Sequence, residues 1–376
     1  MTSPASRMFV HPHALTRALA RAFPTPLFLL PPTVGIDISD TSAKWLALDS
    51  TGESRRVRTF GEIALTEGVV VGGIIKDPAA LGDALRQLKQ HVGGIEYVHA
   101  ALPEEAVYVF SMHVPPRSRR EQILQIIEFE LEGRVPIPPS AAVYDYNIIE
   151  EHEGDAGVEI AVAVFPRDLA ESYAAAFERA GFILMSLELE ARSIARAITS
   201  PAPNEPITLL VDFGRARTGF AVLKRGIPIF TSTAEVGGNA VTRAVMQTLS
   251  LNEKKVEEFK NVSGLDTTAG SKRTGIEAVI GAASALADEV ARYYHYWDTR
   301  RDDKGNRVTP VGRVVLVGGS SNLRGLPDYI AGRIQAPVEI GNVWHNICSF
   351  DDYIPPIDAR TSLQYATCVG LALRGM

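Results

Sequence analysis

The sequence is poor in the residues that would indicate a disulfide-bonded, metal-holding or membrane-spanning protein. Cysteine occurs twice in 376 residues, as Cys348 and Cys368, and neither belongs to a Cys-x-x-Cys pair or a Cys/His array. We therefore expect both thiols to be reduced, buried and inert. The eight histidines are scattered, and none has the spacing of metal ligands. No apolar stretch approaches the roughly 20 residues that are needed to span a bilayer.

Basic residues are not in excess either. The formal net charge is −6, from 38 lysines and arginines and 44 aspartates and glutamates. This balance argues against nucleic acid as a partner, because nucleic-acid-binding domains usually carry a basic face. The apolar fraction of 46% and the charged fraction of 22% are typical of a globular protein. Because the chain is long for a single hydrophobic core, we expect two lobes.

Residues 1–32 differ in character from the rest of the chain. A short amphipathic helix is expected at residues 13–23, and a proline-studded apolar arm follows it. The prolines interrupt the apolar run and no small-residue cleavage site follows, so a signal peptide is not expected. Two interpretations stay open: a leader that packs its leucines on the first lobe, or a peripheral contact with a membrane or a partner.

Two stretches that share one plan organise the chain. Residues 34–49 (VGIDISDTSAKWLALD) predict a buried strand that ends near Asp37, a tight polar turn and a second strand. Residues 209–224 (LLVDFGRARTGFAVLK) repeat this plan, with Asp212 in the position of Asp37. Two such units in two halves of the chain predict a duplicated, two-lobed protein. Turns that face each other across a cleft would suit a phosphate chain and its Mg²⁺, which prefers a few carboxylates and several waters.

The expected architecture is α/β with two lobes. We place lobe one at residues 33–200, with a small α+β insertion at about residues 96–181, and lobe two at residues 206–355. The segment PAPNEP between the lobes is the clearest linker. A final helix within residues 361–376 is expected to complete lobe one. Its small residues permit close crossing of the Ala-rich helix that is expected at residues 188–200.

Lobe two contains two further glycine-rich turns. Gly237-Gly238 opens a helix, and the N-terminus of a helix is a ready anion site. A buried strand at residues 313–317 is followed by Gly-Gly-Ser-Ser-Asn and a helix, which suits the close approach of a flat or phosphorylated ligand to the backbone. A charged helix at residues 252–260 (NEKKVEEFK) is expected to present a solvated face.

The order of these motifs resembles the superfamily of actin, heat-shock ATPases and sugar kinases. Closer matching identifies the chain as similar to the type IV pilus assembly PilM family, relatives of the cell-division protein FtsA. The local matches include GIDISDTSAKW, VPIPPSAAVYDY, LELEARSIARAI and LVGGSSNLRGLPDYIA, and together they run from about residue 34 to residue 376. The resemblance implies a two-lobed actin-like (ribonuclease H-like) ATPase fold with a small α+β insertion subdomain in lobe one. It also implies ATP and Mg²⁺ as ligands.

The resemblance assigns roles to individual residues. Asp37 and Asp212 would hold Mg²⁺ through water and, together with Glu190, would carry any catalysis. For Glu289 and Arg292, which would lie beside the sugar and purine, a second interpretation as an i,i+3 surface ion pair stays open. The residues that the resemblance places around the nucleotide are Ser39, Asp40, Thr41, Ser42, Lys44, Gly214, Thr218, Gly237, Gly238, Glu289, Arg292, Gly318, Gly319, Ser320 and Asn322.

One position departs from the family pattern. Ser39 stands where glycine is usual, and glycine would let phosphate approach the backbone at no steric cost. Asp40 follows it, and the negative charge of this residue beside a triphosphate must be offset by Mg²⁺ or Lys44. We therefore expect at most slow ATP hydrolysis and leave enzymatic activity open.

By resemblance the chain is an ATP-binding scaffold in the assembly complex of a type IV pilus or a related type II secretion-like machine. It would lie in the cytoplasm, at the inner face of the cytoplasmic membrane. There it would bind the N-terminal cytoplasmic peptide of a PilN-like inner-membrane protein. The peptide would occupy a groove between the core of lobe one and its insertion, near residues 119–131. Formation of a homo-oligomer is left open.

Two other functions stay open. A filament-forming cell-division adaptor similar to FtsA would be favoured by an extended C-terminal amphipathic helix, but the sequence stops at Arg374-Gly375-Met376, directly after the expected core helix. A small-molecule kinase on the same fold would need an acidic base above a sugar pocket, and no such motif is present.

Overall fold

The computed structural model describes residues 31–51, 54–151, 157–200, 204–266, 273–301 and 305–374. The amphipathic helix and most of the arm that the sequence predicts at residues 1–32 lie outside the described residues. Within the described part of the chain, no helix is long and apolar enough to cross a membrane.

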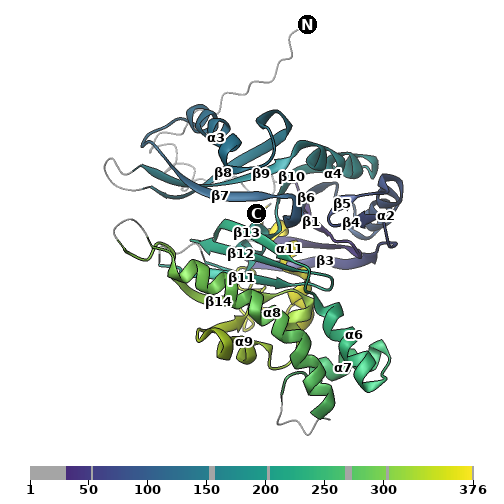
Figure 1. Cartoon of the computed structure of the whole chain (residues 1–376). Helices are drawn as coiled ribbons and strands as arrows, with labels where there is room; N and C mark the ends of the chain where they lie inside the picture. The colour runs from purple at the N-terminus through teal and green to yellow at the C-terminus, as the bar shows by residue number, and fades with distance from the viewer. Residues whose placement is uncertain are drawn as a thin grey trace.

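Lobe one is built on a five-stranded mixed sheet (Figure 1). Its strands are β1 (Thr33–Ile38), β2 (Ser42–Thr51), β3 (Ser54–Ala64), β6 (Tyr97–Leu102) and β10 (Ile183–Leu189). Their order is β10-β6-β1-β2-β3, in which β1, β2 and β3 are antiparallel neighbours and β6 and β10 are added in parallel.

Lobe two repeats this arrangement. Its strands are β11 (Ile207–Phe213), β12 (Thr218–Lys224), β13 (Ile227–Ala234), β14 (Val311–Val317) and β15 (Val338–Ile340). Their order is β13-β12-β11-β14-β15, again with an antiparallel meander at one side and parallel strands at the other. The two hairpins β1–β2 and β11–β12 therefore occupy equivalent places in the two sheets. The duplicated, two-lobed fold that the sequence predicts is confirmed.

Helices cover one face of each sheet, because alternate strand residues on that face are apolar. In lobe one, α2 (Pro78–His91) and α4 (Arg167–Arg179) share a buried core with β1 and β6. In lobe two, α6 (Gly238–Leu249), α8 (Arg273–Thr299) and α9 (Leu326–Ile334) share a core with β11 and β14. A further helix, α7 (Glu253–Val262), packs against α6.

Two helices cross between the sheets, as the small residues of the sequence predict. They are α5 (Glu190–Ile198) and α11 (Ala366–Arg374), and α11 follows α10 (Ala359–Ser362) and a short 3₁₀ turn. Their core includes residues of β2 on one side and of β11 and β14 on the other. The crossing is so close that a Cβ at Gly370 would lie 1.7 Å from the carbonyl oxygen of Ser193. Glycine is therefore required at this position.

The insertion forms a separate three-stranded sheet of order β7-β9-β8. It comprises β7 (Tyr108–Val114), α3 (Arg120–Arg134), β8 (Ala142–Glu151) and β9 (Val158–Pro166). The separate sheet is shorter than the insertion expected at about residues 96–181, because β6 and β10 join the lobe-one sheet and α4 packs into the lobe-one core.

The insertion also contacts lobe two. Figure 1 shows its β7 running beside β13, the edge strand of lobe two. Among the described residues, two ion pairs add to the contact between the insertion and lobe two: Lys224 Nζ lies 2.6 Å from Glu159 of β9, and Arg225 lies 2.7 Å from Glu150 of β8. The insertion is thus in contact with both lobes.

Candidate functional site

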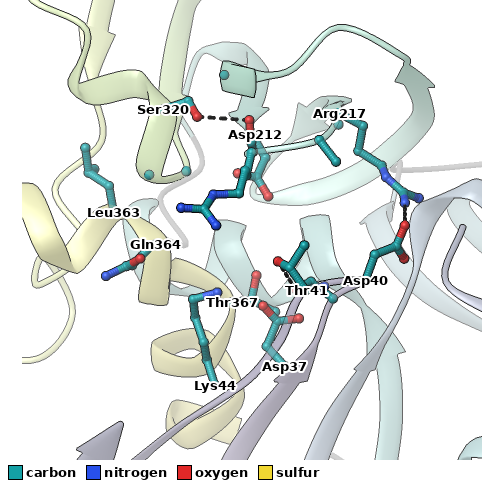
Figure 2. A pocket seen from close by; sticks show the side chains of 18 of the residues that line it. Asp37, Asp40, Thr41, Lys44, Asp212, Arg217, Ser320, Leu363, Gln364 and Thr367 are labelled. Atoms are coloured by element: carbon teal, nitrogen blue, oxygen red, sulfur yellow. Dashed lines mark hydrogen bonds and ion pairs between the residues drawn. The ribbon is translucent and has the colours of Figure 1, made fainter. Parts of the chain in front are cut away.

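The two hairpin turns lie on one cavity of about 670 Å³ between the lobes (Figure 2). The lobe-one turn is closed by the N–H of Ser39, which donates to the carbonyl of Ser42 at 2.9 Å. The lobe-two turn is closed by the N–H of Gly214, which donates to the carbonyl of Arg217 at 3.0 Å. The two turns therefore face one cleft, as expected from the sequence.

Four carboxyl groups lie deep in this cavity. Asp37 and Asp212 occupy equivalent positions in β1 and β11, Glu190 is the first residue of α5, and Glu104 follows β6. Burial raises the pKa of Asp212 to about 7, and the charge of Asp37 adds to this effect. Burial, with the charge of Asp212 adding to it, raises the pKa of Glu104 to about 8.

The pKa values of the other two carboxyl groups, Glu190 and Asp37, are also raised. Burial raises the pKa of Glu190 well above its usual range, and the charges of Asp37 and Glu104 contribute further. Burial also raises the pKa of Asp37, while nearby Lys44 opposes this shift. Crowded carboxyl groups of this kind favour either protonation or a bound cation. The site is therefore suited to a divalent cation.

The carboxyl groups suit Mg²⁺ held through water rather than a cage of protein ligands. No group of three or more His, Cys, Asp or Glu side chains among the described residues is arranged to hold a metal ion alone. Mg²⁺ commonly keeps several waters and uses one or two carboxylates together with phosphate oxygens. Asp37 and Asp212, one from each lobe, supply donors of the right chemistry for such an ion.

Lys44 and Asp40 have different partners. The ammonium of Lys44 donates to the hydroxyl of Ser42 at 2.8 Å and lies 3.2 Å from Glu62. The carboxylate of Asp40 pairs with Arg217 of the opposite lobe. In this structure, the charge of Asp40 is therefore offset by a guanidinium that the sequence did not single out.

Ser39 fits its turn without strain. It does not have the positive φ that would favour glycine. Its hydroxyl accepts the N–H of Ser42 at 3.2 Å and lies 3.1 Å from the carbonyl of the same residue. The backbone conformation of the turn therefore does not require the glycine that is usual in the family.

Three glycine-containing turns of lobe two meet at Gly214. The N–H of Gly238 and the hydroxyl of Ser320 both donate to the Gly214 carbonyl, at 3.0 Å each. Gly318 has a φ of +85°, and a Cβ there would lie 2.3 Å from a carboxylate oxygen of Asp212. Glycine at this position lets the turn approach the acidic residue.

Most of the residues predicted for the site are brought together, and they come from both lobes. Three predicted residues lie behind the cavity wall: Ser42 and Thr218 are buried, and Gly237 packs against the backbone of Ala216. The hydroxyl of Thr218 donates to the Val236 carbonyl. The predicted residues that line the cavity are Asp37, Ser39, Asp40, Thr41, Lys44, Glu190, Asp212, Gly214, Gly238, Gly318, Gly319, Ser320 and Asn322.

Glu289 and Arg292 do not line the cavity. They pair with each other on α8, and the Arg292 side chain is 60% exposed, so the surface ion pair is the arrangement that the structure has. A pair with the same spacing does line the cavity from α7: Lys260 Nζ lies 2.8 Å from Glu257 and 3.1 Å from the Thr242 hydroxyl. The helix has the solvated face that the sequence predicts, at Glu253, Lys254 and Glu258, but Lys260 on its other side is only 6% exposed.

Sequence reasoning missed several other residues of the wall. A Glu-x-x-Lys spacing could have indicated Glu257 and Lys260, and an acidic pair directly after a buried strand could have indicated Glu104 and Glu105. No comparable signal exists for the remaining members. The missed residues that line the cavity include Glu62, Glu104, Glu105, Arg215, Arg217, Asn239, Thr242, Glu257, Lys260, Gln364 and Thr367.

Two equivalent sheets, a pair of helices that cross between them and a polar cavity at the hairpin turns define an actin-like protein. A sequence model of the family described as type IV pilus assembly protein PilM matches residues 35–376. The chain therefore belongs to this family, as the sequence motifs predict.

Similar structures and sequences agree with this fold. A PilM-PilN type IV pilus biogenesis complex is similar with a TM-score of 0.73 and 21% identity, over 91% of this chain and 98% of that chain. MreB 5 of Spiroplasma citri bound to AMPPNP is similar with a TM-score of 0.52 and 12% identity, over 91% and 95%. The cell division protein FtsA of Enterococcus hirae is 22% identical over 364 residues, which cover 85% of this chain and 82% of that protein. The expected actin-like fold class is confirmed.

Proposed function

We propose that the protein binds Mg²⁺ and ATP in the cavity between the lobes. The observation that carries the proposal is that both acidic hairpins, Asp37 with its turn and Asp212 with its turn, line one cavity. The N–H groups of such turns suit phosphate, and the similar MreB 5 structure is bound to AMPPNP. The cavity volume of about 670 Å³ is in the range of small-molecule and cofactor sites.

The ionisable groups of the wall favour a metal ion beside this ligand. Among the described residues, eight carboxyl groups and four cationic groups line the cavity. The raised pKa values of Glu104 (about 8) and Asp212 (about 7) favour protonation of these groups without a cation, and Mg²⁺ would let the carboxyl groups that face it ionise while it offsets part of the phosphate charge. Asp37 and Asp212 would hold the ion through water, with Glu190 beside them, and Lys44 would face the phosphates. The proposal requires binding, with hydrolysis that is slow at most.

Calorimetric titration of Mg·ATP tests this proposal. Wild-type protein should bind with one site per chain, and omission of Mg²⁺ should weaken binding. Asp37→Asn and Asp212→Asn should each weaken binding roughly 10-fold or more, as expected for the loss of a charged group at a metal site. Equal affinity in wild type and both variants would contradict the proposal.

We also propose that the protein is a scaffold of type IV pilus assembly. Membership of the family supports this function, and the similar PilM-PilN structure supports a PilN-like partner. The chain would work in the cytoplasm, at the inner face of the membrane that carries this partner. Its site for the N-terminal peptide of the partner would lie between the core of lobe one and the insertion, near α3.

Titration with synthetic peptides tests the scaffold proposal. The peptides would be the N-terminal cytoplasmic segments of inner-membrane proteins encoded beside this gene. One of them should bind saturably, and a scrambled peptide should not. Saturable binding by none of them would contradict the proposed partner.

A filament-forming adaptor is the second candidate function, and the sequence similarity to FtsA favours it. Sedimentation of the full chain with Mg·ATP separates the two functions. The scaffold proposal expects the protein to stay in the supernatant, whereas nucleotide-dependent pelleting would favour the adaptor.

A further inference from the structure

Arg217 of lobe two reaches across the cavity to two carboxylates of lobe one. Its guanidinium pairs with both Asp40 and Glu105, and Figure 2 shows it directed at Asp40. The side chain of Arg217 is 21% exposed, and those of Asp40 and Glu105 are each 24% exposed. All three residues line the cavity. We call these three residues the inter-lobe bridge. Its members lie where a ligand in the cavity could reach them.

Asp40 is fixed in lobe one independently of the arginine. Its two carboxylate oxygens accept the N–H groups of Gly72 and Gly73 at 3.1 Å each. These glycines form the turn between β4 (Val70–Val71) and β5 (Ile74–Ile75), and both have positive φ. Asp40 keeps these two donors if Arg217 moves away, so the loss of the ion pair does not leave its charge without partners.

Glu105 has a different position, at the base of the insertion. It belongs to the short 3₁₀ turn Glu104–Ala106, which connects β6 of the lobe-one sheet to β7 of the insertion. Its neighbour Glu104 accepts the N–H of Ala191 at 2.8 Å and so is held by the start of α5. The contact between Arg217 and Glu105 therefore ties lobe two to the segment from which the insertion begins.

We propose that Arg217 binds the terminal phosphate of a nucleoside triphosphate in exchange for Glu105 and Asp40, and thereby transmits triphosphate binding to the insertion. This inference rests on the proposed nucleotide function. A guanidinium binds phosphate oxygens through paired, charge-assisted hydrogen bonds, so a phosphate competes effectively with a carboxylate for it. Once Arg217 turns to the phosphate, the base of the insertion loses this ion pair with lobe two, while the Lys224–Glu159 and Arg225–Glu150 pairs remain. A diphosphate lacks the terminal group and leaves the bridge in place.

Hydrogen exchange on the full chain, measured by mass spectrometry, tests the proposal. In wild type, Mg·AMPPNP should raise exchange in β7 about twofold or more, and Mg·ADP should not. Glu105→Gln weakens the bridge, so β7 should exchange faster without nucleotide and respond little to Mg·AMPPNP. Arg217→Ala should do the same and should also reduce the preference for AMPPNP over ADP, by roughly 10-fold.

A matched control and a separate binding measurement complete the test. Asp288→Asn removes one partner of an exposed ion pair with Arg333 in lobe two. This variant should leave the hydrogen exchange of β7 and the preference for AMPPNP over ADP as in wild type. Calorimetric binding of Mg·AMPPNP to wild type without a change in β7 exchange would overturn the proposed role of Arg217 and leave the nucleotide function intact. Absence of calorimetric binding would overturn both. Arg217→Lys, which keeps the charge but not the forked donors, should retain only part of the preference for AMPPNP.

Discussion

Replacement of Glu104 by glutamine tests the account of charge in the cavity. Glu104 is 7% exposed, and its Oε1 accepts the N–H of Ala191 at 2.8 Å. Burial raises the pKa of this carboxyl group from 4.5 to about 8, and the charges of Asp212 and Glu105 add to the shift. Glutamine keeps the acceptor and nearly the same shape but cannot ionise. Glu104→Gln therefore isolates the effect of the charge.

The shift gives the pH dependence of stability both a sign and a size. Between pH 4.5 and pH 8 the folded protein holds a proton at Glu104 that the unfolded chain has released. Retention of this proton stabilises the folded protein. The stabilisation is fully present below pH 4.5 and is lost as the pH rises through about 8. The loss is about 1.4 kcal/mol per pH unit inside this window and roughly 2 kcal/mol between pH 6 and pH 8.

Urea unfolding at pH 6, 7 and 8, followed by circular dichroism, measures the pH-dependent stabilisation that Glu104 contributes. The free energy of unfolding should fall between pH 6 and pH 8 by roughly 2 kcal/mol more in wild type than in Glu104→Gln. Asp288→Asn, which removes an exposed carboxylate of lobe two, is the control and should follow wild type. If wild type and Glu104→Gln lose stability in parallel over this range, the assignment of a buried, protonated carboxyl group to Glu104 is refuted.

Three further predictions concern packing and binding. Gly370→Ala should lower the free energy of unfolding in urea by about 2 kcal/mol or more, because the added Cβ would lie 1.7 Å from a backbone carbonyl of α5. Gly281→Ala on α8 is the matched control. Its added Cβ would meet nothing within 4 Å, so it should raise the free energy of unfolding by about 0.5–1 kcal/mol. Glu257→Gln should weaken Mg·ATP binding roughly 10-fold in calorimetry, because Glu257 lines the cavity, and Glu289→Gln should not, because Glu289 lies outside it; equal effects of the two variants would contradict a contact between Glu257 and the nucleotide. The affinity for Mg·ATP should rise from pH 6 to pH 8, because Asp212, whose pKa is about 7, must lose its proton to face the metal ion; a falling profile would contradict this.

The sequence predicts the parts of the fold that rest on local patterns. The hairpins could be predicted because alternating apolar residues, an aspartate and a turn of small residues occur within 16 residues. The crossing of α5 and α11 could be predicted because both helices carry small residues. The boundary of the insertion could not, because it depends on the parallel pairing of β6 with β1, which lie far apart in the sequence.

The candidate site shows the same limit. Glu289 and Arg292 share the i,i+3 spacing of Glu257 and Lys260, and spacing alone does not say which helix faces the cavity. The pairing of Arg217 with Asp40 joins residues that are 177 positions apart and belong to different lobes. Such contacts follow from the way the lobes pack, which no local pattern encodes.

A crystal structure of the full chain with Mg·AMPPNP tests the central claim most directly. The account predicts that the phosphate chain lies between the turns at Ser39 and Gly214, with the metal ion facing Asp37 and Asp212 through water. A nucleotide bound elsewhere, or a cavity that stays empty at saturating nucleotide, would contradict it.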